Sequence, residues 1–276
     1  MEQLNMLDGQ IIPQIGFGTY KLNGMQGAHA IVSALDQGYR LLDTAYNYEN
    51  EGTVGKAIEM SNVPRDQIII TSKLPGRYQD YDASLTAIQE SIYRLGVEYL
   101  DLYLIHWPNP KQGKYIEAWQ AMIDAQKAGL VKSIGVCNFL PEHIETLEKE
   151  TGVLPVINQI ELHPYFNQRE MVKYNASKGI VTQAWSPLGR ASNVINDEKI
   201  TEIADKHNKT IPQVILKWHI QNGVVPIPKS TSVARQFQNI DIFDFYLDSD
   251  DLEKIDTLTR EDGRRKDQDP AVYEEF

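Results

Sequence analysis

The sequence predicts an α/β fold: a (β/α)₈ TIM barrel whose bottom is closed by an N-terminal β-hairpin. Three observations predict it. Short apolar runs alternate with helical patterns along the chain, eight such runs are present, and 276 residues suit one barrel domain spanning 1–276. A doubly wound open sheet is the structural alternative, but GFG at 16–18 is too short for the Gly-rich dinucleotide fingerprint of such a sheet.

The expected hairpin lies in LNMLDGQIIPQIGFGTY, where two short apolar arms flank Asp8 and Gly9. Asp-Gly between apolar runs is a hairpin turn signal. The predicted barrel strands follow it: RLLDTA near 40, IIITSK at 68–73, LDLYLIH at 100–106, SIGVCN at 133–138, VINQIEL at 156–162, IVTQAWS at 180–186, VVPIPKS at 224–230 and NIDIFDF near 239.

Helical periodicity fills the intervals between these runs. In 82–96, Leu85, Ile88, Ile92 and Leu95 share one face, and Gly96 ends the pattern. The same reasoning predicts helices over 115–129, 198–208 and 210–222, the last with a proline in its first turn.

Composition narrows the function classes. A formal net charge of −11 argues against a nucleic-acid partner, and the single cysteine, Cys137, excludes an intrachain disulfide. The first ten residues lack a signal-peptide pattern, and no apolar run approaches the roughly 18 residues that would suggest a membrane span. We therefore expect a cytoplasmic protein without a membrane partner, monomeric or at most a weak dimer.

Polar residues end the predicted strands. Asp43, Lys73 and His106 end the first three, and Tyr48 follows in the loop after Asp43. Because active sites of such barrels form at the C-terminal ends of the strands, these side chains should converge on one opening. Later strands carry further polar or aromatic residues near their ends: Asn138, Gln159, Trp185, Ser186, Lys229 and Ser230.

This set of residues indicates general acid chemistry. One His and one Asp fall short of the ligand set of a catalytic zinc site, so we expect no metal, and no serine lies in a G-x-S-x-G elbow. A free tyrosine has a pKa of about 10, too high for an efficient acid at neutral pH. Lys73 is expected to lower the pKa of Tyr48, Asp43 to keep Lys73 charged, and His106 to orient a substrate oxygen.

An acid without a nucleophile or a metal suggests that a cofactor carries the reaction. Lys229, Ser230, Thr231 and Arg235 cluster within seven residues, ahead of a stretch (SVARQFQN) expected to open a helix. Cations beside a helix N-terminus bind phosphate. Trp185 could stack on a flat ring.

These residues resemble the aldo-keto reductases almost from end to end. RLLDTAYNYENE resembles the first signature of that family, with Asp43 and Tyr48 in catalytic positions, while ITSK and LDLYLIHWP supply Lys73 and His106. IGVCNF, QIELHP, AWSPLG and IPKS match further family segments in the expected order. The resemblance implies the (β/α)₈ barrel and NADPH-dependent reduction of aldehydes and ketones, with hydride from the nicotinamide of NADPH/NADP⁺ and a proton from Tyr48.

The resemblance also implies the cofactor contacts. Asn138 and Gln159 would hold the nicotinamide amide, and Trp185 would stack on its ring. The remaining implied contacts are Asp43, Gly18 and Thr19 near the cofactor, Ser186 and Leu188 at the pyrophosphate, Lys229, Ser230, Thr231 and Arg235 at the 2′-phosphate end, and Gln238 and Asn239 at the adenine. The implied substrate contacts are Tyr48, His106 and Trp107.

The end of the chain, REDGRRKDQDPAVYEEF, resembles the tails of a bacterial subgroup that includes diketogluconate and glyoxal-type reductases. Such a tail commonly covers the substrate site. The loop LPGRYQDY after Lys73 lacks the Trp of many members, so the physiological carbonyl compound stays open among small aldehydes, dicarbonyls such as methylglyoxal, and keto sugars or acids.

Two other functions stay open at this stage. An NADPH-binding regulatory subunit with little turnover would use the same fold, although the intact set Asp43, Tyr48, Lys73 and His106 favours an enzyme. A barrel hydrolase or isomerase that binds no nicotinamide is the third hypothesis.

Overall fold

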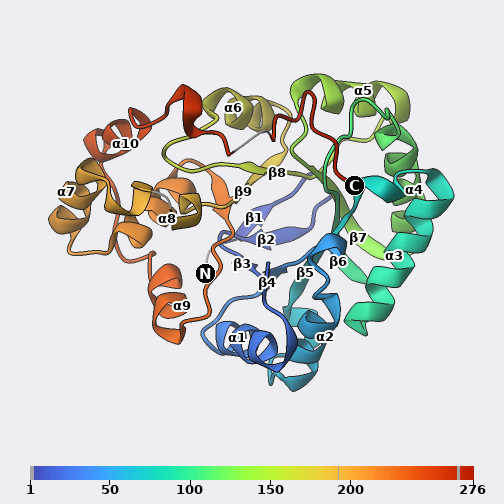
Figure 1. The fold of residues 1–276 in the computed structure, drawn as a ribbon, viewed down its shortest axis with the longest axis horizontal. Coiled ribbons are helices and arrows are strands. Elements are labelled where there is room, and N and C mark those ends of the chain that lie inside the picture. Colours follow the sequence, from blue (N-terminus) through green and yellow to red (C-terminus); the bar gives the residue numbers. More distant parts are fainter. Residues whose placement is uncertain (1–2, 192, 266–267) are drawn as a thin grey trace.

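The computed structural model describes residues 3–191, 193–265 and 268–276, and eight parallel strands form its centre (Figure 1). The strands are hydrogen-bonded in chain order. Gly16 N donates to Pro226 O and Gly18 N to Pro228 O, each at 3.0 Å, so the first and last strands meet. The predicted (β/α)₈ barrel is confirmed, with β3 (Phe17–Gly18), β4 (Leu41–Asp43), β5 (Ile69–Leu74), β6 (Leu100–Ile105), β7 (Val131–Cys137), β8 (Ile157–Glu161), β9 (Val181–Trp185) and β10 (Val224–Pro226).

Helices surround the strands (Figure 1). The α-helices are α1 (Gly24–Asp36), α2 (Glu51–Met60), α3 (Tyr81–Leu95), α4 (Tyr115–Lys127), α5 (Pro141–Thr151), α6 (Arg169–Ser177), α7 (Glu198–His207), α8 (Ile211–Gln221), α9 (Val233–Ile240) and α10 (Ser249–Asp256). Short 3₁₀ turns are η1 (Tyr46–Tyr48), η2 (Arg65–Gln67), η3 (Gly76–Tyr78), η4 (Gly189–Ala191), η5 (Asn193–Asn196) and η6 (Glu261–Gly263). The four helices predicted from periodicity are α3, α4, α7 and α8.

Local sequence explains where these helices stop and start. α3 ends because Gly96 adopts a left-handed backbone with φ +65°. α8 starts at a capping box, in which the Thr210 side chain accepts from Gln213 N and the Gln213 side chain accepts from Thr210 N. None of the helices in the described ranges combines the length and the apolarity needed to cross a membrane.

The prediction of a strand near 239 is wrong. Residues up to Ile240 form the end of α9, and no strand is assigned to the described residues that follow. The apolar residues of this run pack against the hydrophobic core without forming a strand: Ile242 is buried in it, and Phe243 is partly buried against it. The barrel strand that the sequence did not reveal is β3, the first along the chain, because two residues are too few to show a period-2 pattern.

The hairpin closes the end of the barrel opposite the C-terminal ends of the strands. β1 (Gln3–Asn5) pairs antiparallel with β2 (Ile11–Pro13) around the predicted turn. Met6 and Ile12 pack with Leu102 and Ile157, which belong to the apolar cluster inside the barrel. The apolar end of the interior is thus sealed, which leaves the other end for polar groups.

After α10 the tail runs past α6 and ends beside α4, as the red trace in Figure 1 shows. The predicted tail includes residues 266 and 267, which lie outside the described residues. Its final segment is described and packs against the loop that follows β6, where Glu275 N donates to Asn109 Oδ1 at 2.9 Å.

We expect Gly55→Ala to destabilise the fold although alanine favours helix. A Cβ at Gly55 would lie 2.2 Å from the carbonyl oxygen of Leu95, whereas one at Gly52 would lie 3.7 Å from that of Arg94. Overpacking costs about 1–3 kcal/mol, more than the gain in helix propensity of about 1 kcal/mol. Thermal unfolding should show a lower Tm for Gly55→Ala and no loss for Gly52→Ala. Equal Tm values would contradict the close approach of α2 to α3.

Candidate active site

Four predicted residues lie at the C-terminal ends of four neighbouring strands. Asp43 ends β4 and Lys73 is the penultimate residue of β5. His106 directly follows β6, and Asn138 directly follows β7. Because these strands are parallel and adjacent, their ends form one continuous rim.

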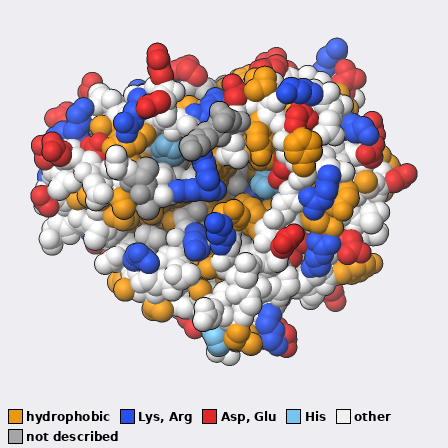
Figure 2. Space-filling model, in the orientation of Figure 1, with side chains coloured by type: hydrophobic (Ala, Val, Ile, Leu, Met, Phe, Trp, Pro, Cys, Tyr) orange, Lys and Arg blue, Asp and Glu red, His pale blue; other side chains and the backbone are white. Residues whose placement is uncertain are grey.

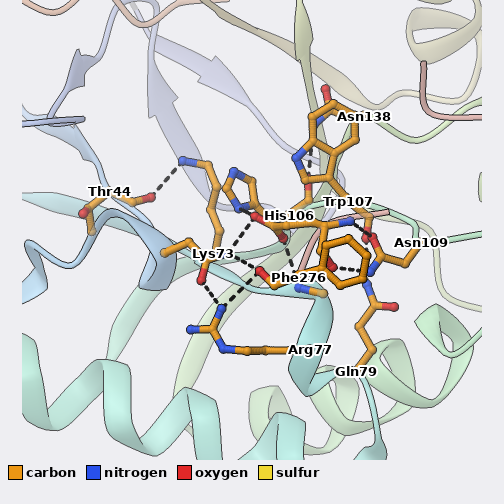
Figure 3. Close-up of polar contacts among 12 residues, drawn as sticks. Thr44, Lys73, Arg77, Gln79, His106, Trp107, Asn109, Asn138 and Phe276 are labelled. Carbon is orange, nitrogen blue, oxygen red and sulfur yellow. Dashed lines mark hydrogen bonds and ion pairs between the residues drawn. The ribbon is translucent and has the colours of Figure 1, made fainter. Parts of the chain in front are cut away.

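A buried ion pair forms the base of this rim. Lys73 Nζ lies 2.6 Å from Asp43 Oδ2, and the two side chains are 0% and 6% exposed. The same ammonium donates to Thr44 O at 2.8 Å (Figure 3), and Gln159 Nε2 donates to Asp43 Oδ1 at 2.8 Å. Burial lowers the pKa of Lys73, but Asp43 and Tyr48 more than offset it, so the net pKa is raised. Lys73 therefore carries its proton at neutral pH.

Tyr48, in η1, lies near both the lysine and the histidine. The Lys73 ammonium is 5.0 Å from the centre of the Tyr48 ring, and the His106 ring is 5.9 Å from it in an edge-on arrangement. Burial raises the pKa of Tyr48, Lys73 lowers it and Asp43 raises it again, with a net value of about 12. The expected effect of the cation is present, but the expected net lowering is wrong because burial outweighs it. The phenol thus keeps its proton at neutral pH.

The residues expected to hold a nicotinamide amide form a connected polar chain. Asn138 has a left-handed backbone with φ +60°, which asparagine tolerates well. Its Nδ2 donates to His106 O at 3.1 Å, and its Oδ1 accepts from Trp185 Nε1 at 2.8 Å. Gln159 also donates to Gln183 Oε1 at 3.0 Å. The indole of Trp185 is therefore fixed in orientation while its residue stays partly exposed.

Gly18 and Thr19 lie where β3 meets β4 and β10. Thr19 donates twice to the carbonyl of Asp43, from its backbone N at 3.0 Å and its hydroxyl at 2.9 Å. A Cβ at Gly18 would lie 3.2 Å from the Ile227 carbonyl and 3.5 Å from the Lys229 Cβ. Both residues hold the rim together, whatever else they contact.

The predicted phosphate-binding residues surround the start of α9. Ser232 caps the helix by accepting from Arg235 N at 3.4 Å, and Ser230 Oγ accepts from Ser232 N at 3.1 Å. Lys229, Thr231 and Arg235 are exposed, and among the described residues neither cation has an ion-pair partner. Gln238 is exposed and Asn239 is buried.

A groove of about 630 Å³ opens beside Ser186, and Figure 2 shows Lys and Arg side chains around the hollow on this face. Its lining includes four arginines, of which Arg190 donates to Ser186 Oγ at 2.9 Å and lies 5.3 Å from the centre of the Tyr20 ring. Leu188 lies in the same loop and is partly buried. The other three arginines come from the segment after α10: Arg260, Arg264 and Arg265.

Comparison with known proteins decides the family. Residues 14–260 match the sequence pattern of the Aldo/keto reductase family. The chain belongs to this family. Among its relatives, 2,5-diketo-D-gluconic acid reductase B of a Corynebacterium species is 47% identical over 273 residues, which are 99% of this chain and 98% of that protein. The resemblance predicted from the motifs is confirmed.

Two further proteins are similar to this chain over nearly its whole length. Methylglyoxal reductase DkgA of Escherichia coli is 44% identical over 271 residues, covering 98% of this chain and 97% of that protein. The crystal structure of an aspartate-to-alanine variant of Gox0644 in complex with NADPH superimposes with a TM-score of 0.94 at 44% identity, covering 99% and 98% of the two chains.

Sequence reasoning pointed to the tail and to the loop after β5, but it did not single out Tyr273 and Glu275 in the tail or Gly76 in the loop. Trp107, a predicted substrate contact, is only 5% exposed because the Tyr273 ring lies 4.4 Å from it. Glu275 is buried beside His106. Within the described ranges, no cluster of three or more His, Cys, Asp or Glu side chains could hold a metal ion.

We expect Asp43 and Lys73 to be strongly coupled in stability. Asp43→Asn and Lys73→Met should each lower the free energy of unfolding by about 3–5 kcal/mol, because each leaves a buried charge without its partner. The double variant should cost clearly less than the two single costs together. Urea unfolding measures all four proteins.

Lys173→Met is the control, since Lys173 pairs with Glu170 in solvent and such pairs contribute little. Additive costs for the buried pair would contradict the coupling.

Proposed function

We propose that this chain is an NADPH-dependent reductase of small aldehydes and ketones. The observation that carries the proposal is the grouping of a phenol, a buried charged lysine and an imidazole at one rim, beside a groove lined by arginines. The names of its relatives, a diketogluconate reductase and methylglyoxal reductases, support small carbonyl compounds as substrates.

The residues around the groove fit a phosphorylated dinucleotide. Lys229 and Arg235 are exposed cations beside the N-terminus of α9, which suits a terminal phosphate. Arg190 and Ser186 line the groove and suit the pyrophosphate, in a chain whose formal net charge is −11. Trp185 offers a fixed, partly exposed ring for stacking. Asn138 and Gln159 lie beside it and offer amide groups for the carboxamide.

The bound dinucleotide supplies the hydride. Tyr48 keeps a proton on its hydroxyl at neutral pH and donates it to the carbonyl oxygen as negative charge develops there. Lys73, held charged by Asp43, stabilises the phenolate that remains. The His106 ring lies beside that of Tyr48 and orients the same oxygen.

The regulatory alternative has less support. A cofactor-binding subunit without turnover needs the groove but not the proton-donating group. Here Asp43, Lys73, Tyr48 and His106 are all present, and each lies next to the following one in this order. A hydrolase or isomerase without nicotinamide leaves the arginine-lined groove unexplained. We further propose that residues 1–276 act as one domain, as a monomer in the cytoplasm.

Tyr48→Phe should reduce kcat for methylglyoxal reduction by about 10²–10⁴, the contribution of general acid catalysis. NADPH binding should be unchanged, since the proposed role of the phenol is to donate a proton to the substrate and not to bind the cofactor. Stopped-flow NADPH oxidation measures the first quantity, and quenching of tryptophan fluorescence by NADPH measures the second. Equal turnover in both proteins would remove Tyr48 from the proposed role. Turnover in neither, with NADPH still bound, would favour the regulatory subunit.

Arg235→Ala should weaken NADPH binding by about 10- to 100-fold, because a charge-assisted hydrogen bond contributes about 1.5–3 kcal/mol. NADH binding should change little, since NADH lacks the 2′-phosphate. Fluorescence titration with the two cofactors gives both affinities. Val233→Ala, also exposed on the same helix and assigned no cofactor contact, is the matched control for effects on the helix. Equal weakening of NADPH and NADH would place Arg235 away from the 2′-phosphate.

A further inference from the structure

The last described segment of the chain packs against the loop that follows His106. Tyr273 covers Trp107, and Glu274 Oε1 accepts from Lys111 N at 2.7 Å. Figure 3 shows Phe276 beside Arg77 and Asn109 at this place, and Arg77 Nη1 donates to Phe276 O at 3.3 Å. The tail is therefore held by both aromatic and polar contacts next to the proposed catalytic residues.

Glu275 places its carboxylate on the ring nitrogen of His106. Glu275 Oε1 lies 2.7 Å from His106 Nδ1 and also accepts from Asn47 Nδ2 at 2.8 Å. Glu275 Oε2 accepts from Gly76 N at 3.0 Å. The residue is 8% exposed, so protein encloses this carboxylate. Its polar contacts are therefore stronger than they would be in water.

The backbone around Glu275 is shaped to receive it. Asn109 Nδ2 donates to Glu275 O at 2.8 Å, while Glu275 N donates back to Asn109 Oδ1 at 2.9 Å (Figure 3 shows Asn109). A Cβ at Gly76 would lie 2.2 Å from both Asn109 Nδ2 and Glu275 O. Only glycine at position 76 leaves room for this arrangement.

The carboxylate is ionised at neutral pH. Burial raises the pKa of Glu275, but its close contact with His106 and the hydrogen bonds from Asn47 and Gly76 lower it by more, so the net pKa lies below the usual value. The contact with Nδ1 is close but poorly aligned, since among the described residues Nδ1 has no hydrogen bond of good angle. We read it as an ion pair, whose attraction is largest when the imidazole is charged.

We infer that Glu275 is a positioning residue, which keeps Nδ1 as a protonated nitrogen of His106 and favours the imidazolium. This inference rests on the proposed role of His106. With Nδ1 engaged by the carboxylate, Nε2 is the nitrogen left for the substrate. Nε2 carries a proton only in the imidazolium, because the neutral ring then has its single proton on Nδ1. His106 therefore donates to a carbonyl oxygen in its charged form.

The other ionisable groups around His106 are not expected to change their charge near neutral pH. The pKa of Tyr48 is raised to about 12, that of Lys73 is raised, and burial raises that of the Cys137 thiol well above its usual value. Asp43, on β4, is ion-paired to Lys73, and Arg77, in η3, is a permanent cation. A change in rate near neutral pH therefore does not come from these groups.

The test compares Glu275→Gln with Glu274→Gln. Glu274 is the neighbouring carboxylate on the same tail and contacts Lys111 N and Gln112 instead of the histidine. For methylglyoxal reduction, kcat/KM of the wild type should fall as pH rises. In Glu275→Gln the fall should begin at lower pH, with about tenfold less activity than wild type at high pH and similar activity at low pH. Glu274→Gln should follow the wild type throughout.

Nitrogen-15 NMR of histidine-labelled wild type provides an independent readout, with a His106→Gln variant assigning the signal. The neutral ring should carry its proton on Nδ1, and Glu275→Gln should change this signal while Glu274→Gln does not. A neutral ring protonated on Nε2 in the wild type overturns the inference, as does a Glu275→Gln profile that is lowered equally at every pH or matches the wild type.

The same measurements separate this inference from the proposed function. If Glu275→Gln shifts the His106 signal but His106→Gln and Tyr48→Phe leave turnover intact, the pairing stands and the proposed catalytic roles fail.

Discussion

The buried ion pair between Lys73 and Asp43 is the constraint on which the site depends. Removing two charges from water costs several kcal/mol per ion, which close pairing and further hydrogen bonds must offset. Here Lys73 donates to Asp43 and to Thr44 O, and Gln159 donates to Asp43, so the cation and three other polar groups form one connected set. Hydrophobic residues of similar volume would stabilise the barrel equally well. The pair is therefore best explained by what it does to Tyr48.

The barrel separates the polar end from the apolar end and so makes this pair possible. Parallel strands bring Asp43, Lys73 and Asn138 to one rim, while the hairpin fills the opposite end with Met6 and Ile12. Ion pairs near bulk water contribute little, because solvent screens them. At the base of a closed rim the same groups act through a less polarisable medium, in which each charge strongly affects the protonation of its neighbours.

The sequence alone predicts most of the barrel and of the residues at its rim, because polar residues that end apolar runs mark the ends of strands. Asp43, Lys73 and His106 each interrupt or follow an apolar run, and a parallel barrel leaves one place for such residues to meet. β3 was missed because two residues carry no periodicity, and the apolar alternation after α9 reflects packing between helices and barrel. The net pKa of Tyr48 could not be predicted, since it depends on burial. Glu275 was missed because its contact with His106 joins distant parts of the chain.

Two donors at the rim are supported by charges of opposite sign. Lys73 lies beneath Tyr48 and favours the anion that forms when the phenol gives up its proton. Glu275 lies against His106 and favours the cation that can donate from Nε2. A carbonyl oxygen near both rings would meet the O–H of Tyr48 and the N–H of His106. The phenolate of the first and the imidazolium of the second are both stabilised by charges already in place before the substrate arrives. Such preorganised charge, rather than a strongly acidic tyrosine, accounts for general acid catalysis by a phenol whose pKa is about 12.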